Sequence, residues 1–484
     1  RSSRGLGDVY KRQFLYSDRP GKHQHVSTIY IYDQSTAPTG TVRFKSILNH
    51  VRHRLGTSRL FRQKLVHVPF NLDYPYWIED PHFELEFHVR HIALPHPGDW
   101  RQFCIQVARL HSRPLDMNRP VWEMYVIEGL DNIPFLPDGA FAVMTKVHHS
   151  AIDDVTENDV TVALHDLTPD AEEEEFRDLW RSENKPGNME LLSLAWFNNT
   201  TKLLETGQAL WDKLPWVGEH AHETEETLHI GDEEAPHTRF DDDLSPHRVW
   251  DARFFDAGEF DAIAATVPGA THDDVVLAII SGALRRYLDS KGELPQRSMF
   301  ALLPIHVRHE SDRGIPGHRV KLERAKIMTA IQDAYERLQA IHLEMIRVKS
   351  EDVLSADEMT ELQEVLPSVT MAAAARTIVA GFGPGEHFRE DHNTVVTNVP
   401  GPEQPLYLCG AKLIGFTGMG IILDNLALAH NVTSYDGQVS IAAVSDRIVM
   451  PDPGFYADCL DTAFEELKQV ARKRAVKSTA AMAR

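Results

Sequence analysis

The apolar positions in the first third of the chain alternate between strand and helix spacing. Dense β-branched residues predict a strand over residues 25–32, and helical spacing follows over residues 44–55. An extended stretch covers residues 76–80, and residues 102–110 again show helical intervals. Two further strands are predicted over residues 121–128 and 140–147, and the turn-rich loop between them indicates that they pair antiparallel.

The last half of the chain mixes the two spacings in the same way. We predict helices over residues 259–265 and 273–287, a strand over 299–307, a long helix over 322–348, and strands over 395–398, 427–433 and 439–444. The fold class is therefore α/β (α+β).

The length of 484 residues favours two large domains, at roughly 150 residues each. We expect a first lobe over residues 14–170, a linker over 171–245, a second lobe over 246–470 and a basic tail over 471–484. In the linker, Trp196, Leu203 and Leu210 recur every seven residues, which predicts an amphipathic helix.

Residues 1–13 read RSSRGLGDVYKRQ and lack the apolar centre of a signal peptide. The string looks like translated library-adapter sequence. We therefore expect a non-native leader, with the natural chain resuming near Phe14.

The charge is concentrated in one segment. Of a net charge of -21, residues 166–243 contribute 21 acidic against 6 basic side chains, so the chain lacks the positive surface of a sequence-independent nucleic-acid binder. Three cysteines are too few for a disulfide framework or a thiolate cluster, which favours a reducing compartment. No stretch reaches the ~18 apolar residues of a membrane-spanning helix.

The candidate chemistry lies where the predicted strand over residues 140–147 runs into His148 and His149. Neighbouring side chains at a strand end point to opposite faces, so only one of the two can face a substrate. A neutral imidazole, with an ordinary pKa of ~6.5, can take up a proton and return it. Asp153 follows four residues later, where its carboxylate can fix the loop. Taken alone, such a pair is more often packed or solvated than catalytic.

Metal binding is the rival interpretation, because the chain has 26 histidines. It has no His-Glu-x-x-His motif and no cysteine pair. Three His-Val-Arg-His strings begin at His50, His88 and His306, but the arginine inside each would oppose a cation. We expect no metal site.

Nine motifs occur in order along nearly the whole chain: WIED (77–80), FHVRH (87–91), LHSRPLD (110–116), RPVWE (119–123), KVHHSAID (146–153), GAT (269–271), DVVLA (274–278), NVPGP (398–402) and SYDG (434–437). Together they resemble the bacterial wax ester synthase/diacylglycerol acyltransferase family.

The resemblance implies two chloramphenicol-acetyltransferase-like lobes of the CoA-dependent acyltransferase type, joined by a helical linker, with the histidine motif where two substrate channels meet. It implies an O-acyltransferase that esterifies diacylglycerol and/or a long-chain fatty alcohol to triacylglycerol or wax ester. His149 would be the general base beside His148, and Asp153 would hold the loop. Acyl-CoA would be a co-substrate, with no bound cofactor.

The second lobe would contribute an active-site wall that includes Asn398. The segment from Arg308 to Lys326 contains six basic and three acidic residues, and the basic side chains could bind the phosphates of coenzyme A. The family pattern has glycine where this chain has Asp154, at a position that can require a positive φ. It has asparagine where this chain has Asp273, so an amide that can donate to the reacting oxygen is lost. The altered N-terminus is a third departure.

Two alternatives stay open. One is a condensation-type acyltransferase that uses a carrier-bound thioester or an amine, and the other is a catalytically weakened lipid-binding homologue, favoured by Asp154 and Asp273. We expect a cytoplasmic protein without a nucleic-acid partner. Peripheral contact with the inner membrane or a lipid inclusion is motivated by the apolar stripe over residues 196–211 and the basic residues 472–474, although the stripe can equally pack across the lobes.

Overall fold

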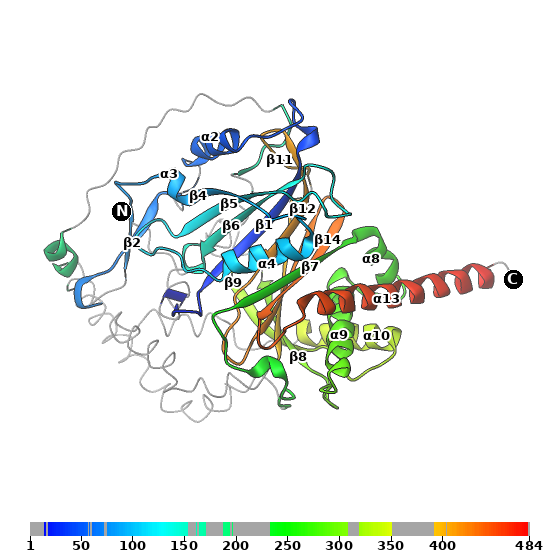
Figure 1. Cartoon of the computed structure of the whole chain (residues 1–484). Coiled ribbons are helices and arrows are strands. Elements are labelled where there is room, and N and C mark those ends of the chain that lie inside the picture. Colours follow the sequence, from blue (N-terminus) through cyan, green and yellow to red (C-terminus); the bar gives the residue numbers. More distant parts are fainter. Residues whose placement is uncertain are drawn as a thin grey trace.

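The structure, a computed structural model, describes residues 14–15, 18–56, 58, 61–71, 75–152, 161, 164–170, 187–193, 196, 233–307, 319–350, 392–402 and 404–482. The strands in these residues form two six-stranded sheets and one two-stranded sheet. Strands and helices of both halves pack side by side, so the α/β class expected from the sequence is confirmed (Figure 1).

The first sheet has the order β11-β12-β1-β6-β5-β4. Its strands are β1 (His25–Asp33), β4 (Val89–Ala93), β5 (Trp122–Glu128), β6 (Phe141–His148), β11 (Tyr407–Leu408) and β12 (Ala411–Met419). β5 and β6 pair antiparallel, as predicted, and β6 also pairs antiparallel with β1. Every residue of β6 is buried, because both of its edges and both of its faces are covered.

Helices cover the first sheet on both faces. α2 (Phe44–Arg54) contributes Ile47 and Val51 to one cluster, while α4 (Trp100–His111) contributes Phe103 and Val107 to another. The short helix α3 (Leu85–His88) leads into β4, and β2 (Gln63–Val66) pairs with β3 (Tyr76–Glu79) as a separate hairpin. α4 begins at Asp99, whose side chain accepts from the backbone N–H of Gln102.

The second sheet has the order β7-β14-β13-β10-β8-β9. Its strands are β7 (Arg248–Asp256), β8 (Phe300–Val307), β9 (Arg319–Lys326), β10 (Thr394–Pro400), β13 (Leu428–Tyr435) and β14 (Gln438–Asp446). Helices α8 (Ala257–Ala264), α9 (His272–Ser290), α10 (Ala334–Ser350) and α13 (Pro453–Met482) lie on one side of it (Figure 1). Parallel pairing joins β10 to both β13 and β8.

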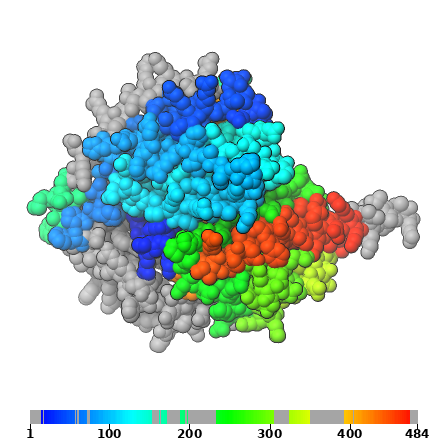
Figure 2. Space-filling model, in the orientation of Figure 1, coloured from blue at the N-terminus to red at the C-terminus, as the bar shows by residue number. Residues whose placement is uncertain are grey.

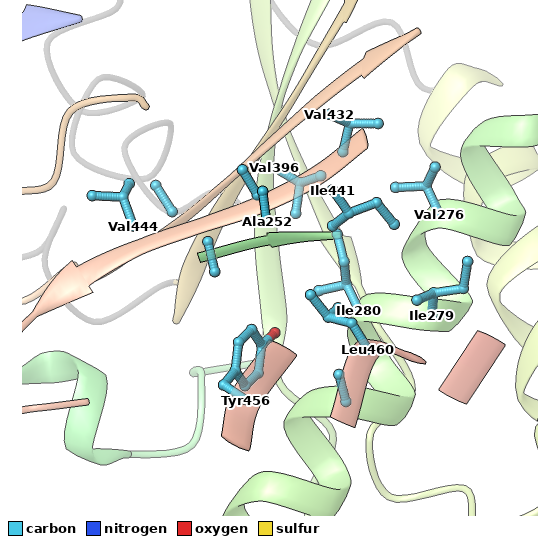
Figure 3. Packing of buried hydrophobic residues seen from close by; sticks show 14 of the residues in the cluster. Ala252, Val276, Ile279, Ile280, Val396, Val432, Ile441, Val444, Tyr456 and Leu460 are labelled. Carbon is cyan, nitrogen blue, oxygen red and sulfur yellow. The ribbon is translucent and has the colours of Figure 1, made fainter. Parts of the chain in front are cut away.

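Apolar side chains fill the space between this sheet and its helices, in the same cluster that α4 joins. Ile279 and Ile280 of α9 and Leu460 of α13 meet Ala252 and Ile441 of the sheet (Figure 3). All five are buried, and burying each isoleucine or leucine side chain contributes about 1.5–3 kcal/mol. The helix predicted over residues 273–287 is thus α9, with its apolar centre buried.

The two halves of the molecule share strands and core. β11 and β12 come from the C-terminal half of the sequence but complete the first sheet, where β12 pairs antiparallel with β1. α4 of the first half packs on β7 of the second, and the Trp100 Nε1–H donates to Asp251 Oδ1 at 2.8 Å. In Figure 2 the blue and cyan residues of the first half lie directly against the green and red residues of the second half. The chain therefore crosses between the sheets more than once.

One predicted element is wrong over its first part. The long helix expected over residues 322–348 begins only at Ala334, as α10, whereas residues 322–326 belong to a strand, β9, which a turn separates from α10. β9 pairs along its whole length with β8, and this ladder outweighs the helical preference of its Leu, Glu, Arg and Lys residues. Residues 471–482, expected as a tail, continue α13.

Within the described residues, no helix combines the length and apolar character needed to cross a bilayer. Of the amphipathic stripe predicted over residues 196–211, only Trp196 is described, so that prediction lies outside the described residues.

Candidate active site

The histidine pair stands at the end of β6, as the sequence predicted. His148 closes the strand and caps the short 3-10 helix η4 (His149–Ala151). The backbone N–H of His148 donates to the Val121 carbonyl at 2.9 Å, and that of His149 donates to the Gln24 carbonyl at 2.8 Å. The residues before β5 and before β1 therefore hold the two peptides from opposite sides.

The His148 ring is fully buried, with both ring nitrogens in hydrogen bonds. Nδ1 lies 2.7 Å from Ser150 Oγ and 3.2 Å from Ser150 N, and Nε2 lies 3.2 Å from Asp18 Oδ2. A backbone N–H can only donate, so Nδ1 accepts and Nε2 carries the proton toward the carboxylate. Neither nitrogen of His148 is left to act on a substrate.

The His149 ring has a different environment. It is half-buried, and it stacks on Phe14 with ring centroids 4.0 Å apart and an interplanar angle of 23°. The two neighbours thus differ in exposure as expected for a strand end. His149 is the more exposed member of the pair.

A cluster of polar residues that sequence reasoning missed surrounds His148. Asp18 Oδ1 lies 3.2 Å from His23 Nδ1, and Asp18 Oδ2 accepts from the Gln24 backbone at 3.1 Å. Burial alone would raise the pKa of the Asp18 carboxyl, but the hydrogen bonds from His148, His23 and Gln24 outweigh it and lower the pKa below its ordinary value. Asp18 is therefore a carboxylate at working pH.

Two more histidines lie behind this cluster. His25 faces His148 across the β1–β6 ladder, and its Nε2 bonds to the His111 carbonyl, while Ser27 Oγ lies 2.8 Å from His111 Nδ1. Burial, followed by the nearby charges that include Lys146, holds the pKa values of His25 and His111 well below the ordinary value. Both rings are neutral. In the sequence, His25 opens the first predicted strand and His111 lies in the LHSRPLD motif, but neither position indicated a contact with His148.

Lys146 lies two residues before His148 on the same face of β6 and is fully buried. Its ammonium donates to the Leu110 and Arg113 carbonyls at 3.1 and 3.0 Å and pairs with Glu123 at 3.0 Å. Burial lowers the pKa of Lys146. This cation sits at the C-terminus of α4, where the helix dipole favours positive charge.

The second sheet approaches β1 beside the pair. A small cavity of about 40 Å³ lies between the sheets. Thr161 and residues of β1, β10, β12 and β13 line it: Val26, Ser27, Thr28, Val399, Phe416, Gly418, Met419, Asn431, Val432 and Thr433. On β1 its lining begins one residue after His25, which is the register partner of His148. The cavity therefore marks the meeting of the two sheets close to the histidine pair.

Two of the predicted wall residues contact each other. Asn398, on β10, donates from Nδ2 to Asp273 Oδ1 on α9 at 2.8 Å. α9 begins there with a capping box between Thr271 and Asp274. The Asp273 carboxylate thus accepts a hydrogen bond from the Asn398 amide. The sequence could not indicate this contact. Asp153, Asp154 and Arg308 lie outside the described residues.

Two family models cover most of the chain. The wax ester synthase/diacylglycerol acyltransferase catalytic domain matches residues 10–276, and the WS/DGAT C-terminal domain matches residues 317–468.

Similar proteins align over nearly the full length. The O-acyltransferase WSD of Acinetobacter baylyi is 28% identical over 448 residues, covering 90% of this chain and 91% of that protein. The solved structure of the wax ester synthase/diacylglycerol acyltransferase from Marinobacter aquaeolei VT8 superposes with a TM-score of 0.65 at 28% identity, covering 96% of this chain and 98% of that one. A trichothecene 15-O-acetyltransferase from Fusarium sporotrichioides shares the fold, with a TM-score of 0.53 at 11% identity over 96% of this chain and 94% of that one. With its histidine motif at the meeting of two such sheets, the chain belongs to the wax ester synthase/diacylglycerol acyltransferase family of O-acyltransferases.

Proposed function

We propose that the protein transfers a long-chain acyl group from acyl-CoA to the hydroxyl of diacylglycerol, of a long-chain fatty alcohol, or of both, with His149 as the general base. The observation that carries the proposal is the contrast within the pair. His148 is fully buried with both nitrogens in hydrogen bonds, whereas His149 is half-buried at the same strand end.

The proposed step needs one imidazole. Neutral His149 takes the proton of the acceptor hydroxyl, and the oxygen attacks the thioester carbonyl carbon. The tetrahedral intermediate then collapses as the C–S bond breaks, and the imidazolium returns the proton to the sulfur of coenzyme A. The products are an ester and free CoA, with no covalent acyl-enzyme.

The remaining predicted residues have supporting roles in this proposal. His148 fixes the strand end, and Asp153 holds the loop that follows. Asn398 and Asp273 belong to the second-lobe wall, and Arg308 meets the phosphates of acyl-CoA. The contact between Asn398 and Asp273, 2.8 Å long, supports a shared location for these two.

The test uses purified full-length protein, radiolabelled palmitoyl-CoA, and either hexadecanol or dioleoylglycerol. We expect labelled ester with at least one acceptor and no label on the protein when the acceptor is omitted. An acyl-enzyme that survives denaturation would contradict direct transfer. Absence of ester with either alcohol, but ester or amide with a carrier-bound thioester or an amine, would favour the condensation-type alternative.

A second candidate function is a weakened, lipid-binding homologue. It is favoured by one specific observation, that the Asn398 amide donates to a carboxylate, Asp273, in place of the family's asparagine. Tight palmitoyl-CoA binding without any ester product would support it.

Contact with a membrane or lipid inclusion is a further part of the proposal, since both acceptor classes are lipids. Flotation with liposomes tests it: we expect a fraction of the protein to float with the vesicles. Protein that stays entirely in the aqueous phase would contradict it.

A further inference from the structure

The segment of residues 18–24 runs beside the histidine pair just before β1, and the proposed transfer step makes no use of it. Its first residue, Asp18, gathers three partners on one carboxylate. Oδ2 accepts from the Gln24 backbone at 3.1 Å and lies 3.2 Å from His148 Nε2, while Oδ1 lies 3.2 Å from His23 Nδ1. Asp18 thus connects this segment to the histidine pair by its hydrogen bond with His148.

The contact with His148 fixes a tautomer. Ser150 N–H occupies the Nδ1 side of the ring at 3.2 Å, so the ring proton lies on Nε2 and points at Asp18. A carboxylate only accepts, and a hydrogen bond to a charged acceptor is about twice as strong as one between neutral groups. Asp18 therefore sets both the orientation and the protonated nitrogen of His148.

The same carboxylate is linked to the His149 backbone through one residue, Gln24. Gln24 donates its N–H to Asp18, and its carbonyl accepts from the His149 N–H at 2.8 Å. Gln24 is only 2% exposed, so water does not compete for these bonds. The backbone of the proposed base thus bonds to the carbonyl of Gln24, a residue whose N–H bonds to Asp18.

The other side of the segment is tied to the second half of the molecule. Lys22 Nζ pairs with Asp424 at 2.5 Å, and the Arg248 guanidinium donates to the Gly21 carbonyl at 2.8 Å. Gly21 has a φ of +81°, and a Cβ there would lie 3.3 Å from Pro246. The turn before β1 is therefore fitted to the second half, and contacts on both sides fix the position of Asp18.

We propose that Asp18 is a positioning residue for the active site. It holds His148 in its Nε2–H tautomer and, through Gln24, sets the backbone of His149, so that the His149 imidazole meets the acceptor hydroxyl in a productive orientation. This inference rests on the proposed function of His149 and deepens it.

The kinetic test compares Asp18→Ala and Asp18→Asn with Asp33→Ala as the matched control. Asp33 lies at the other end of β1 and caps the 3-10 helix η1 (Gln34–Thr36), accepting from the Ser35 backbone at 2.9 Å. We expect Asp18→Ala to lower kcat about 10- to 100-fold, as misplacing a catalytic group by about 1 Å does. The KM for palmitoyl-CoA should change less than about twofold. Asp18→Asn keeps an acceptor oxygen and should lose less, and Asp33→Ala should match the parent protein.

A second measurement does not depend on turnover. In protein labelled with ¹⁵N-histidine, the His148 Nε2–H signal is assigned by its loss in His148→Asn. We expect it to exchange slowly in the parent and in Asp33→Ala, to shift in Asp18→Asn, and to vanish in Asp18→Ala. If Asp18→Ala does not fold, Asp18→Asn alone decides.

The two readouts separate the two claims. If the parent forms no ester but the signal depends on Asp18, the proposed function fails while the hold on His148 stands. If ester forms, and neither kcat nor the signal responds to the Asp18 substitutions, the positioning role is overturned.

Discussion

Replacing each of the two neighbouring histidines should change the stability of the fold to a different extent. His148→Ala should destabilise the fold, whereas His149→Ala should leave it nearly as stable as the parent. The reason is burial: His148 is 0% exposed and bonded through both nitrogens, while His149 is half-buried and stacks on Phe14.

The magnitude follows from the contacts of each ring. A hydrogen bond to a charged partner such as Asp18 contributes about 1.5–3 kcal/mol, and one to a neutral partner such as Ser150 about 0.5–1.5 kcal/mol. His148→Ala should therefore lower the free energy of unfolding by about 2–4.5 kcal/mol. For His149→Ala the lost stacking on Phe14 contributes about 0.5–1.5 kcal/mol.

Two matched variants divide the His148 contribution. The glutamine amide of His148→Gln can reach Asp18 in place of Nε2, and the asparagine of His148→Asn can accept from Ser150 in place of Nδ1. The order of stability in guanidinium unfolding, followed by tryptophan fluorescence, should be parent, then His148→Gln, then His148→Asn, then His148→Ala. If His148→Ala unfolds at the same denaturant concentration as His149→Ala, the structural role of His148 is refuted.

Three further predictions concern the rest of the fold and site. Burial lowers the pKa of His430 to about 3, so below pH ~6.5 the unfolded chain binds a proton on this ring that the folded chain does not. The free energy of unfolding should therefore decrease by about 1.4 kcal/mol in total as the pH is lowered from 7.5 to 5.5, and His430→Asn should remove that share of the decrease in urea unfolding. Lys146→Met should cost about 3–5 kcal/mol because it leaves Glu123 buried beside an apolar side chain, and adding Glu123→Gln should recover part of the loss; equal stability of the single and double variants would contradict the pairing. Asp273→Asn should raise the initial rate of ester formation, since an amide replaces a carboxylate in the proposed wall beside Asn398, and an unchanged or lower rate would exclude Asp273 as the cause of weak activity.

The sequence predicted those parts of the fold that depend on local pattern. The strands β1, β5 and β6 and the helices α2, α4 and α9 lie where the apolar spacing placed them. The position of His148 at a strand end followed from the same pattern, because the apolar run stops at that residue. These elements have one spacing throughout and clear turn residues at their ends.

β9 shows where local pattern misleads. Its sequence RVKLERAK is rich in helix-favouring residues, but pairing with β8 buries Glu323, Arg324 and Ala325 within the sheet edge. The Arg324 guanidinium lies 3.5 Å from the centre of the Phe300 ring of β8. Contacts with a neighbouring strand, which no single-segment pattern contains, decide the structure here.

The residues that surround the histidine pair could not be predicted from the sequence either. His25 and His148 meet only because β1 pairs with β6, across more than a hundred residues of chain. Asp18 and Gln24 precede β1 without any apolar pattern, so nothing marked them as partners of the histidines. Likewise, β12 joins the first sheet from the far end of the sequence.

The central claim is that His149 acts as the base in acyl transfer from acyl-CoA to a lipid alcohol. The most direct test is the initial rate of CoA release and ester formation by His149→Ala, corrected for the folded fraction. The control is His91→Ala, which removes an exposed imidazole of β4 that pairs with Glu128 of β5. We expect the initial rate of His149→Ala to be lower than that of the parent by a factor of about 10²–10⁴, while His91→Ala keeps the parent rate. Ester formation by His149→Ala within about tenfold of the parent would contradict it.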